Sequence, residues 1–126
     1  MKPERWIAVG ALSMGVAVVL GAFGAHALNE RLVASGHLES WHTAVLYQAL
    51  HALALIALGL MPPRLAPRAA GWLFLAGAAL FSGSIYGLAL EGPKAVLGPM
   101  TPLGGVLLIA GWLVLAATAW RRSAAA

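Results

Sequence analysis

The stretch WIAVGALSMGVAVVLGAFGAHAL, residues 6–28, carries no charged side chain and reaches its one histidine, His26, only near its end. A helix needs about 20 apolar residues to cross roughly 30 Å of hydrocarbon, so this stretch is long enough to span a bilayer. Lipid offers the backbone no hydrogen-bond partner, and the stretch does not alternate as a barrel strand does. We therefore expect a transmembrane helix. Its end, Ala25-His26-Ala27, also fits a signal-peptide cleavage pattern, but the apolar run is long enough to span, and we expect it to stay uncleaved.

The composition of the whole chain agrees with a membrane protein. Of its 126 residues, 61% are hydrophobic and only 10% are charged, which is too little polar surface for a water-soluble domain. The formal charge of +4 could suggest a nucleic-acid partner. The basic residues, however, lie in short pieces between apolar runs, so we expect them to orient the protein in a lipid bilayer and expect no nucleic-acid binding. Cysteine is absent, which excludes disulfides and thiolate chemistry.

Three further apolar segments are close to the length of a membrane span, at about residues 41–60, 69–90 and 102–120. Pro62-Pro63 follows the second span and Gly92-Pro93 follows the third, because proline cannot extend a helix behind it. Thr101-Pro102 has the pattern of a helix start, with threonine as N-cap and proline at the first helical position. Short loops join antiparallel neighbours. We therefore predict an all-α integral membrane protein with a single domain, residues 1–126, that forms an antiparallel four-transmembrane-helix bundle.

The basic residues divide unevenly between the two ends of this bundle. Six of the eight fall on the N-terminus, the second loop and the C-terminus: Lys2, Arg5, Arg64, Arg68, Arg121 and Arg122. The first and third loops carry Arg31 and Lys94, together with three glutamates. Because cytoplasmic loops are rich in Lys and Arg, we expect both termini to be cytoplasmic. Four tryptophans lie near span ends, as interfacial anchors do: Trp6, Trp41, Trp72 and Trp120.

Small residues recur along one face of two spans. In the first span they form a stripe, here called the first-span ladder, of Gly10, Ala17, Gly21 and Gly24. In the third span the corresponding third-span ladder is Ala79, Gly83 and Gly87. Such spacing lets another helix backbone approach closely, so we expect tight packing. The pattern leaves open whether the partner helix belongs to the same chain or to another subunit.

The second span is the most polar, and its segment WHTAVLYQALHALALI (residues 41–56) places Tyr47, Gln48 and His51 within one arc of the helix. Polar groups in lipid require hydrogen-bond partners within the protein, so this arc should face the bundle. There Ser82 and Tyr86 of the third span could be its partners. We expect His51 to bridge helices by hydrogen bonds with Tyr47 or Ser82. Proton carriage, ligand binding and haem or metal ligation stay open as alternatives, because histidine titrates near neutral pH. His26 lies close to the outer interface and joins the candidate polar residues.

Enzymatic chemistry finds little support in the sequence. A haem needs two axial ligands at matching depth, whereas His26 lies near the surface and His51 deeper. A zinc site would combine closely spaced histidines and carboxylates, but no carboxylate lies at membrane depth. Catalysis by serine or carboxylate lacks its partner groups. We therefore expect no metal, no cofactor and no enzymatic activity.

Four phrases taken together, LGAFGAHAL, WHTAVLYQALHALALI, FSGSIYGLAL and GPMTPLGG, resemble one family over nearly the whole chain. It is the family of small membrane proteins grouped with transmembrane protein 256, also described as a domain of unknown function, DUF423. The resemblance implies a four-helix, multi-pass protein of the bacterial inner membrane with no established activity. The recurring positions of that family match Gly21, Gly24, His26, Tyr47, Gln48, His51, Ser82, Gly83, Ser84, Tyr86, Thr101, Pro102, Gly104 and Gly105 here. We add Gly104 and Gly105 to the residues expected to pack helices.

Three classes of function remain. The chain could be a non-enzymatic scaffold or accessory subunit that packs through its glycine and alanine ladders, and this is the class we favour. It could instead be a small transport or channel element with His51, Tyr47, Gln48 and Ser82 around a polar cavity. It could also bind haem, quinone or lipid. A homo-oligomer is compatible with all three, and the lipid bilayer is the one partner that the composition itself requires.

Overall fold

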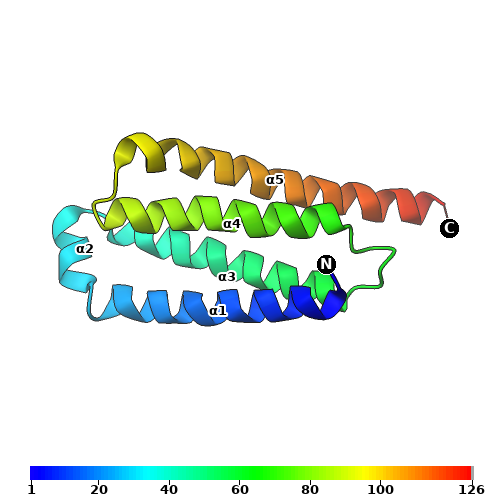
Figure 1. Ribbon diagram of the computed structural model, residues 1–126, viewed down its shortest axis with the longest axis horizontal. Coiled ribbons are helices and arrows are strands. Elements are labelled where there is room, and N and C mark those ends of the chain that lie inside the picture. Colours follow the sequence, from blue (N-terminus) through cyan, green and yellow to red (C-terminus); the bar gives the residue numbers. More distant parts are fainter. Residues whose placement is uncertain (126) are drawn as a thin grey trace.

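The computed structural model describes residues 1–125, and this part of the chain is helical with no strand. Its helices are α1 (Pro3–Ala25), α2 (Asn29–Ser35), α3 (Leu38–Leu60), α4 (Arg68–Ala89) and α5 (Lys94–Ala124). The four long helices, α1, α3, α4 and α5, are long and apolar enough to cross a membrane. They run antiparallel, with both chain termini at one end of the molecule and α2 at the other (Figure 1). The predicted all-α class and the four antiparallel spans are therefore confirmed.

The four long helices lie in a row, in the order in which they occur in the chain. α1 packs against α3, α3 against α4, and α4 against α5, and Figure 1 shows α1 and α5 at opposite edges of the row. Short connections make consecutive helices neighbours, which favours this arrangement. The inner helices α3 and α4 consequently present one face toward α1 and another toward α5.

Glycines and tryptophan bring α1 and α3 together. A Cβ atom on Gly10 would lie 2.6 Å from the Ala52 carbonyl oxygen, so only glycine permits this approach of the two backbones. The indole of Trp41 covers Gly24 and donates a hydrogen bond to the Leu20 carbonyl oxygen at 2.8 Å. Ala17 is buried between these contacts. The first-span ladder therefore packs within the chain.

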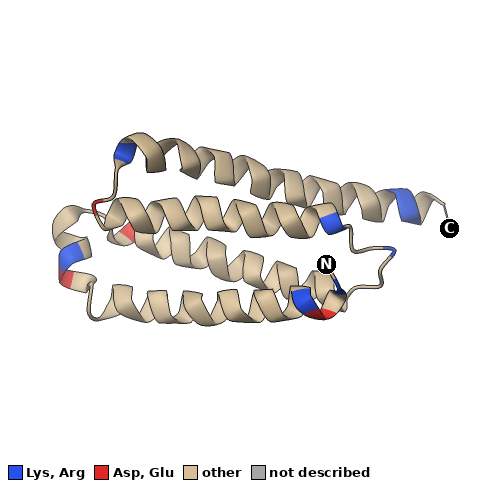
Figure 2. Ribbon diagram, viewed as in Figure 1, with Lys and Arg blue, Asp and Glu red and all other residues tan. Residues whose placement is uncertain are grey.

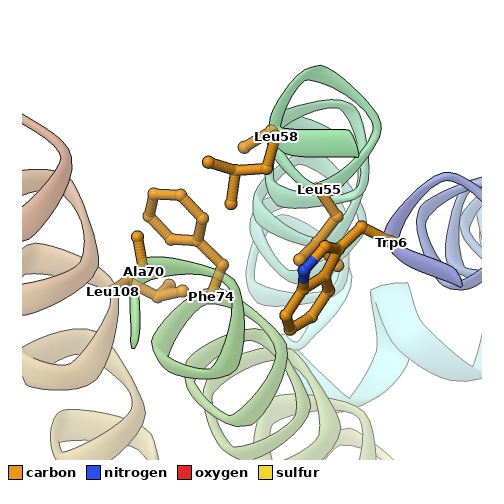
Figure 3. Close-up of a cluster of buried hydrophobic side chains, with 7 residues drawn as sticks. Trp6, Leu55, Leu58, Ala70, Phe74 and Leu108 are labelled. Atoms are coloured by element: carbon orange, nitrogen blue, oxygen red, sulfur yellow. The ribbon is translucent and has the colours of Figure 1, made fainter. Parts of the chain in front are cut away.

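An apolar cluster joins all four long helices near the end that carries the termini. It consists of Trp6, Ala54, Leu55, Leu58, Ala70, Phe74 and Leu108. Figure 3 shows Trp6 entering from α1 and Phe74 lying between Leu58 and Leu108. Gly71 makes room for the Trp6 ring, because a Cβ there would lie 2.5 Å from Cζ2 of that indole. This cluster holds the row together across its width.

The fourth span begins earlier than the sequence predicted. α5 starts at Lys94, and Thr101 lies inside it rather than at its N-cap, so the predicted boundary at residue 102 is wrong. Pro99 and Pro102 both lie within the helix. Proline has a φ angle compatible with a helix and removes one backbone donor, and membrane helices tolerate that loss because nearby side chains and neighbouring helices compensate. The other three spans end within three residues of their predicted limits.

Charges separate toward the two ends of the row. Figure 2 shows blue Lys and Arg segments near the termini and at the α3–α4 connection, and most of the red acidic segments at the α2 end. At the α2 end, Arg31 and Glu91 approach to 3.8 Å as an exposed ion pair. Between those ends, the long helices carry no charge over the length of a membrane core.

Candidate functional site

Gln48 ties together three of the four long helices. Its amide nitrogen Nε2 donates to the Ser13 carbonyl oxygen of α1 at 3.0 Å. Its amide oxygen Oε1 accepts from the Tyr86 hydroxyl of α4 at 2.8 Å. The sequence produces this bridge because residue 48 follows the α3 face that carries Trp41, Ala52 and the contacts with α1. Polar pairs of this kind bind helices to one another at membrane depth.

A groove of about 350 Å³ lies beside this pair, between α1 and α4, with α3 as its floor. We call it the α1–α4 groove. Its lining is mostly apolar, with Val16, Ala52 and Leu75 among the contributing residues. The polar members are Ser13, Gln48, Ser82 and Tyr86. Ser82 is buried and donates to the Ala44 carbonyl oxygen at 2.7 Å, so its hydroxyl is already used.

His51 points to the opposite side of α3 and meets α5. Its Nδ1 lies 2.7 Å from the Tyr47 carbonyl oxygen, and its Nε2 lies 3.0 Å from the indole Nε1 of Trp112. An indole nitrogen can only donate and a carbonyl can only accept, so the imidazole is neutral with its proton on Nδ1. His51 as a residue is 4% exposed, and its ring packs beside Phe74. His51 therefore bridges two helices, α3 and α5.

The predicted partners of His51 are only partly correct. Tyr47 is a partner, through its backbone carbonyl rather than its hydroxyl, and its ring lies against Phe81 at 4.8 Å between centroids. The expected bond to Ser82 is not formed, because Ser82 bonds to Ala44 instead. The interhelical partner is Trp112, which the sequence reasoning missed. The available signal was a tryptophan in the middle of a span, whose N–H requires an acceptor in lipid.

The six residues predicted as one polar cluster occupy separate places. Gln48, Tyr86 and Ser82 line the α1–α4 groove. Tyr47 and His51 lie on the α5 side of α3, because consecutive residues of a helix point about 100° apart. His26 is exposed at the C-cap of α1, away from both groups. The prediction of a single cluster is therefore wrong in its geometry.

The glycines predicted to pack helices fall into two groups, those in close contact with a neighbouring helix and those with room to spare. Gly104 approaches α4 closely, since a Cβ there would lie 2.8 Å from the Gly77 carbonyl oxygen, and Gly87 lies under the Leu97 side chain. Gly21 has room for a methyl group at 3.4 Å from Val45. Gly105 lies at ordinary contact distance, 3.8 Å, from the Phe81 ring. Each of these contacts lies within the chain.

The third-span ladder does not pack as a unit. Ala79 and Gly83 are exposed and line the α1–α4 groove. A Cβ on Gly83 would meet no atom within 4 Å. Within residues 1–125, Ala79 and Gly83 therefore do not form the tight helix contact that was expected of the third-span ladder. Within the same residues, no group of three or more His, Asp or Glu side chains could hold a metal ion.

Comparison of the amino-acid sequence with known proteins identifies a family. The family model described as "Protein of unknown function (DUF423)" matches residues 20–105, which run from the end of α1 into α5. The chain belongs to the DUF423 family. The matched part of this DUF423 protein includes Gln48, Tyr86 and His51, and it ends before Trp112.

Curated relatives extend the similarity over most of the chain. A UPF0382 membrane protein of Staphylococcus epidermidis is 45% identical over 112 residues, which cover 87% of this chain and 90% of the relative. The UPF0382 membrane protein YwdK of Bacillus subtilis is 42% identical and covers 90% and 94%. A UPF0382 membrane protein of Schizosaccharomyces pombe is 40% identical and covers 85% and 94%. No solved structure matches the chain. This DUF423 protein is thus a multi-pass membrane protein of a family of unknown function.

Proposed function

We propose that this protein is a non-enzymatic membrane scaffold that holds an apolar transmembrane helix in its α1–α4 groove. The observation that carries the proposal is the exposed pair Ala79 and Gly83 in that groove, at membrane depth. Small residues at this spacing let a second helix backbone approach closely. Because a Cβ on Gly83 would meet no atom of the described residues packed around it within 4 Å, the contact that its ladder suggests is available to another helix.

The polar pair beside the ladder supports the same proposal. The amide nitrogen of Gln48 carries two hydrogens, and the bond to the Ser13 carbonyl oxygen uses one of them. In hydrocarbon, a hydrogen bond from the second N–H is stabilising. A backbone carbonyl or a hydroxyl of an incoming helix can accept that bond. The bond from Tyr86 holds the amide in place for that contact.

The transport alternative draws less support from the geometry. It requires His51, Tyr47, Gln48 and Ser82 around one cavity. Gln48 and Ser82 line the α1–α4 groove, whereas His51 bonds to Trp112 on the other side of α3. Ser82 and His51 also use side-chain hydrogen bonds to link helices, Ser82 to the Ala44 carbonyl oxygen and His51 to the Trp112 indole. We therefore keep the scaffold as the proposed function.

Self-association is the form of assembly to test first. The protein is extracted from its own membrane into nanodiscs, and its subunit number is measured by native mass spectrometry. Gly83→Leu fills the groove, and Gly15→Leu is the matched control, because Gly15 is also exposed and a Cβ there meets no atom within 4 Å. We expect a defined multiple of the 13.0 kDa chain that Gly83→Leu dissociates and Gly15→Leu preserves. A monomer in the unsubstituted protein, or an oligomer indifferent to Gly83→Leu, contradicts self-association through this groove.

A further inference from the structure

A second hollow lies at the α2 end of the molecule, between the first turn of α3, the last turns of α4 and the start of α5. Its volume is about 430 Å³, within the range of about 300–1,000 Å³ that small-ligand sites occupy. We call it the α3–α5 pocket. It shares no lining residue with the α1–α4 groove, so what it binds is independent of the proposed scaffold function.

The pocket is polar at its outer end. His37 is the N-cap of α3, Ser40 lies in its first turn, and Lys94 is the first residue of α5. The ion pair found within residues 1–125 joins Arg31 to Glu91, and Lys94 makes no ion pair in that part of the chain. His37 bonds through Nδ1 to the Ser35 hydroxyl, which leaves its other ring nitrogen free to donate or accept. The outer end of the pocket therefore offers a cation and two polar side chains to a negatively charged group.

The deeper part of the pocket is apolar. Ile85 and Leu88 of α4 and Gly98 of α5 line it. The hydroxyl of Thr101, which also borders the pocket, lies 2.6 Å from the Ser84 hydroxyl and is already bonded. A Cβ on Gly98 would meet no atom within 4 Å, so this wall is open rather than filled by a neighbouring side chain. Thr101 lies about 10 Å along the helix axis from Lys94, which carries the pocket from the membrane surface into the hydrocarbon.

A polar, cationic outer end and an apolar interior match an amphiphile with a negative head. A soluble anion would contact only the outer end, and an uncharged lipid would leave Lys94 without a partner. We propose that the α3–α5 pocket binds an anionic phospholipid of the surrounding membrane, with its phosphodiester at Lys94 and the start of an acyl chain against Ile85, Leu88 and Gly98. The bilayer supplies amphiphiles at the depth that the pocket spans, and a basic residue near a membrane surface attracts their anionic head groups.

Two substitutions separate the contributions of charge and space. Lys94→Gln removes the cation, and Lys2→Gln is its matched control, because Lys2 is the other lysine of the chain and lies at the N-cap of α1, at the end opposite α2. Gly98→Leu places a bulky side chain in the apolar part of the pocket, where its Cβ would meet no atom within 4 Å, and Gly15→Leu is its control. Full-length protein in detergent is titrated with phosphatidylglycerol or phosphatidylcholine, and bound lipid is counted by native mass spectrometry. Circular dichroism verifies that each variant is helical.

We expect the unsubstituted protein to bind phosphatidylglycerol more tightly than phosphatidylcholine. Lys94→Gln should weaken phosphatidylglycerol binding about fivefold, the effect of one basic residue near a membrane surface, and should weaken phosphatidylcholine binding less, because the choline ammonium offsets the charge of its phosphodiester. Gly98→Leu should weaken both lipids. Equal losses in Lys94→Gln and Lys2→Gln would overturn the proposal, as would unchanged binding in Gly98→Leu. Displacement of phosphatidylglycerol by millimolar inorganic phosphate would show a site for free anions and would overturn the assignment to a phospholipid.

Discussion

At the scale of single residues, His51 shows how one polar side chain can be neutral and structural inside a membrane. Both ring nitrogens are bonded, one to a carbonyl of its own helix and one to the Trp112 indole of α5. Protonation would convert Nε2 from an acceptor into a donor, so that two N–H groups, one of His51 and one of Trp112, would face each other. The bond between these two side chains therefore selects the neutral ring and links α3 to α5.

Trp112→Phe tests this link. The Trp112 and Phe74 rings lie 4.7 Å apart between centroids. The substitution keeps an aromatic ring beside Phe74 but removes the N–H that donates to His51. We expect a loss of about 1 kcal/mol in stability, because hydrogen bonds between membrane helices contribute about 0.6 and at most about 1.7 kcal/mol. The thermal unfolding midpoint in detergent measures this loss. The control is Trp120→Phe, since Trp120 is 77% exposed, and an equal decrease in that variant would contradict a specific role for the bond.

The individual polar residues could be selected from the sequence, but their partners could not. Hydropathy marks Gln48 and His51 as polar groups in lipid that need hydrogen bonds, and both make them. Tyr47 and Gln48 differ by one position and so face different neighbours, a difference that depends on where α4 packs. Trp112 is not selected in this way, because tryptophan is expected at a membrane interface rather than in the middle of a span.

At the scale of helices, glycine spacing indicates where two backbones can approach, and the row of helices decides where they do. The first-span ladder meets α3 at Gly10 and Gly24, whereas a Cβ on Gly83 of the third-span ladder would have no neighbour within 4 Å in residues 1–125. The start of α5 shows a similar limit. Thr101-Pro102 has the local chemistry of a helix start, but α5 continues through both residues from Lys94. Local signals predicted the four spans well and failed where a proline lies inside a helix.

Two adjacent glycines of α5 offer a matched comparison. A Cβ on Gly104 would lie 2.8 Å from the Gly77 carbonyl oxygen, so Gly104→Ala must push α5 away from α4. We expect a loss of about 1–3 kcal/mol, as in other overpacked contacts. Gly105→Ala places its methyl group 3.8 Å from the Phe81 ring and should leave stability nearly unchanged. Thermal unfolding of both variants in the same detergent checks the difference, and equal midpoints would mean that the α4–α5 contact adapts to the added methyl group.

At the scale of the whole molecule, the sequence predicted the number and direction of the spans but not their open arrangement in a row. Composition and loop length are sufficient for the first result. The second depends on which helix faces attract each other, and lipid chains are as apolar as the leucines that they touch. Exposed Leu12 and Ile109 therefore carry no pattern that distinguishes a lipid-facing side from a helix-facing one.

The placement of the termini is a prediction for the intact protein in its membrane. Because the chain has no cysteine, single cysteines can be introduced as reporters. Ser123→Cys lies at the end with the termini, and Ser35→Cys lies on α2 at the other end. The excess of basic residues near the termini favours their cytoplasmic location, so we expect an impermeant maleimide to label Ser35→Cys in intact cells and Ser123→Cys only after lysis. The reverse pattern would place the termini outside.

The row of helices also bears on how the protein is made. The long helices pack mainly as the consecutive pairs α1–α3, α3–α4 and α4–α5, so most contacts between helices join segments that are close in the chain. During synthesis, α3 finds α1 already in the membrane, α4 finds α3, and α5 finds α4. In a closed ring of helices, the first helix would lack one of its neighbours until the last helix is inserted. Here, each newly inserted span can pack against a helix that is already in the membrane, and α4 completes its packing when α5 follows.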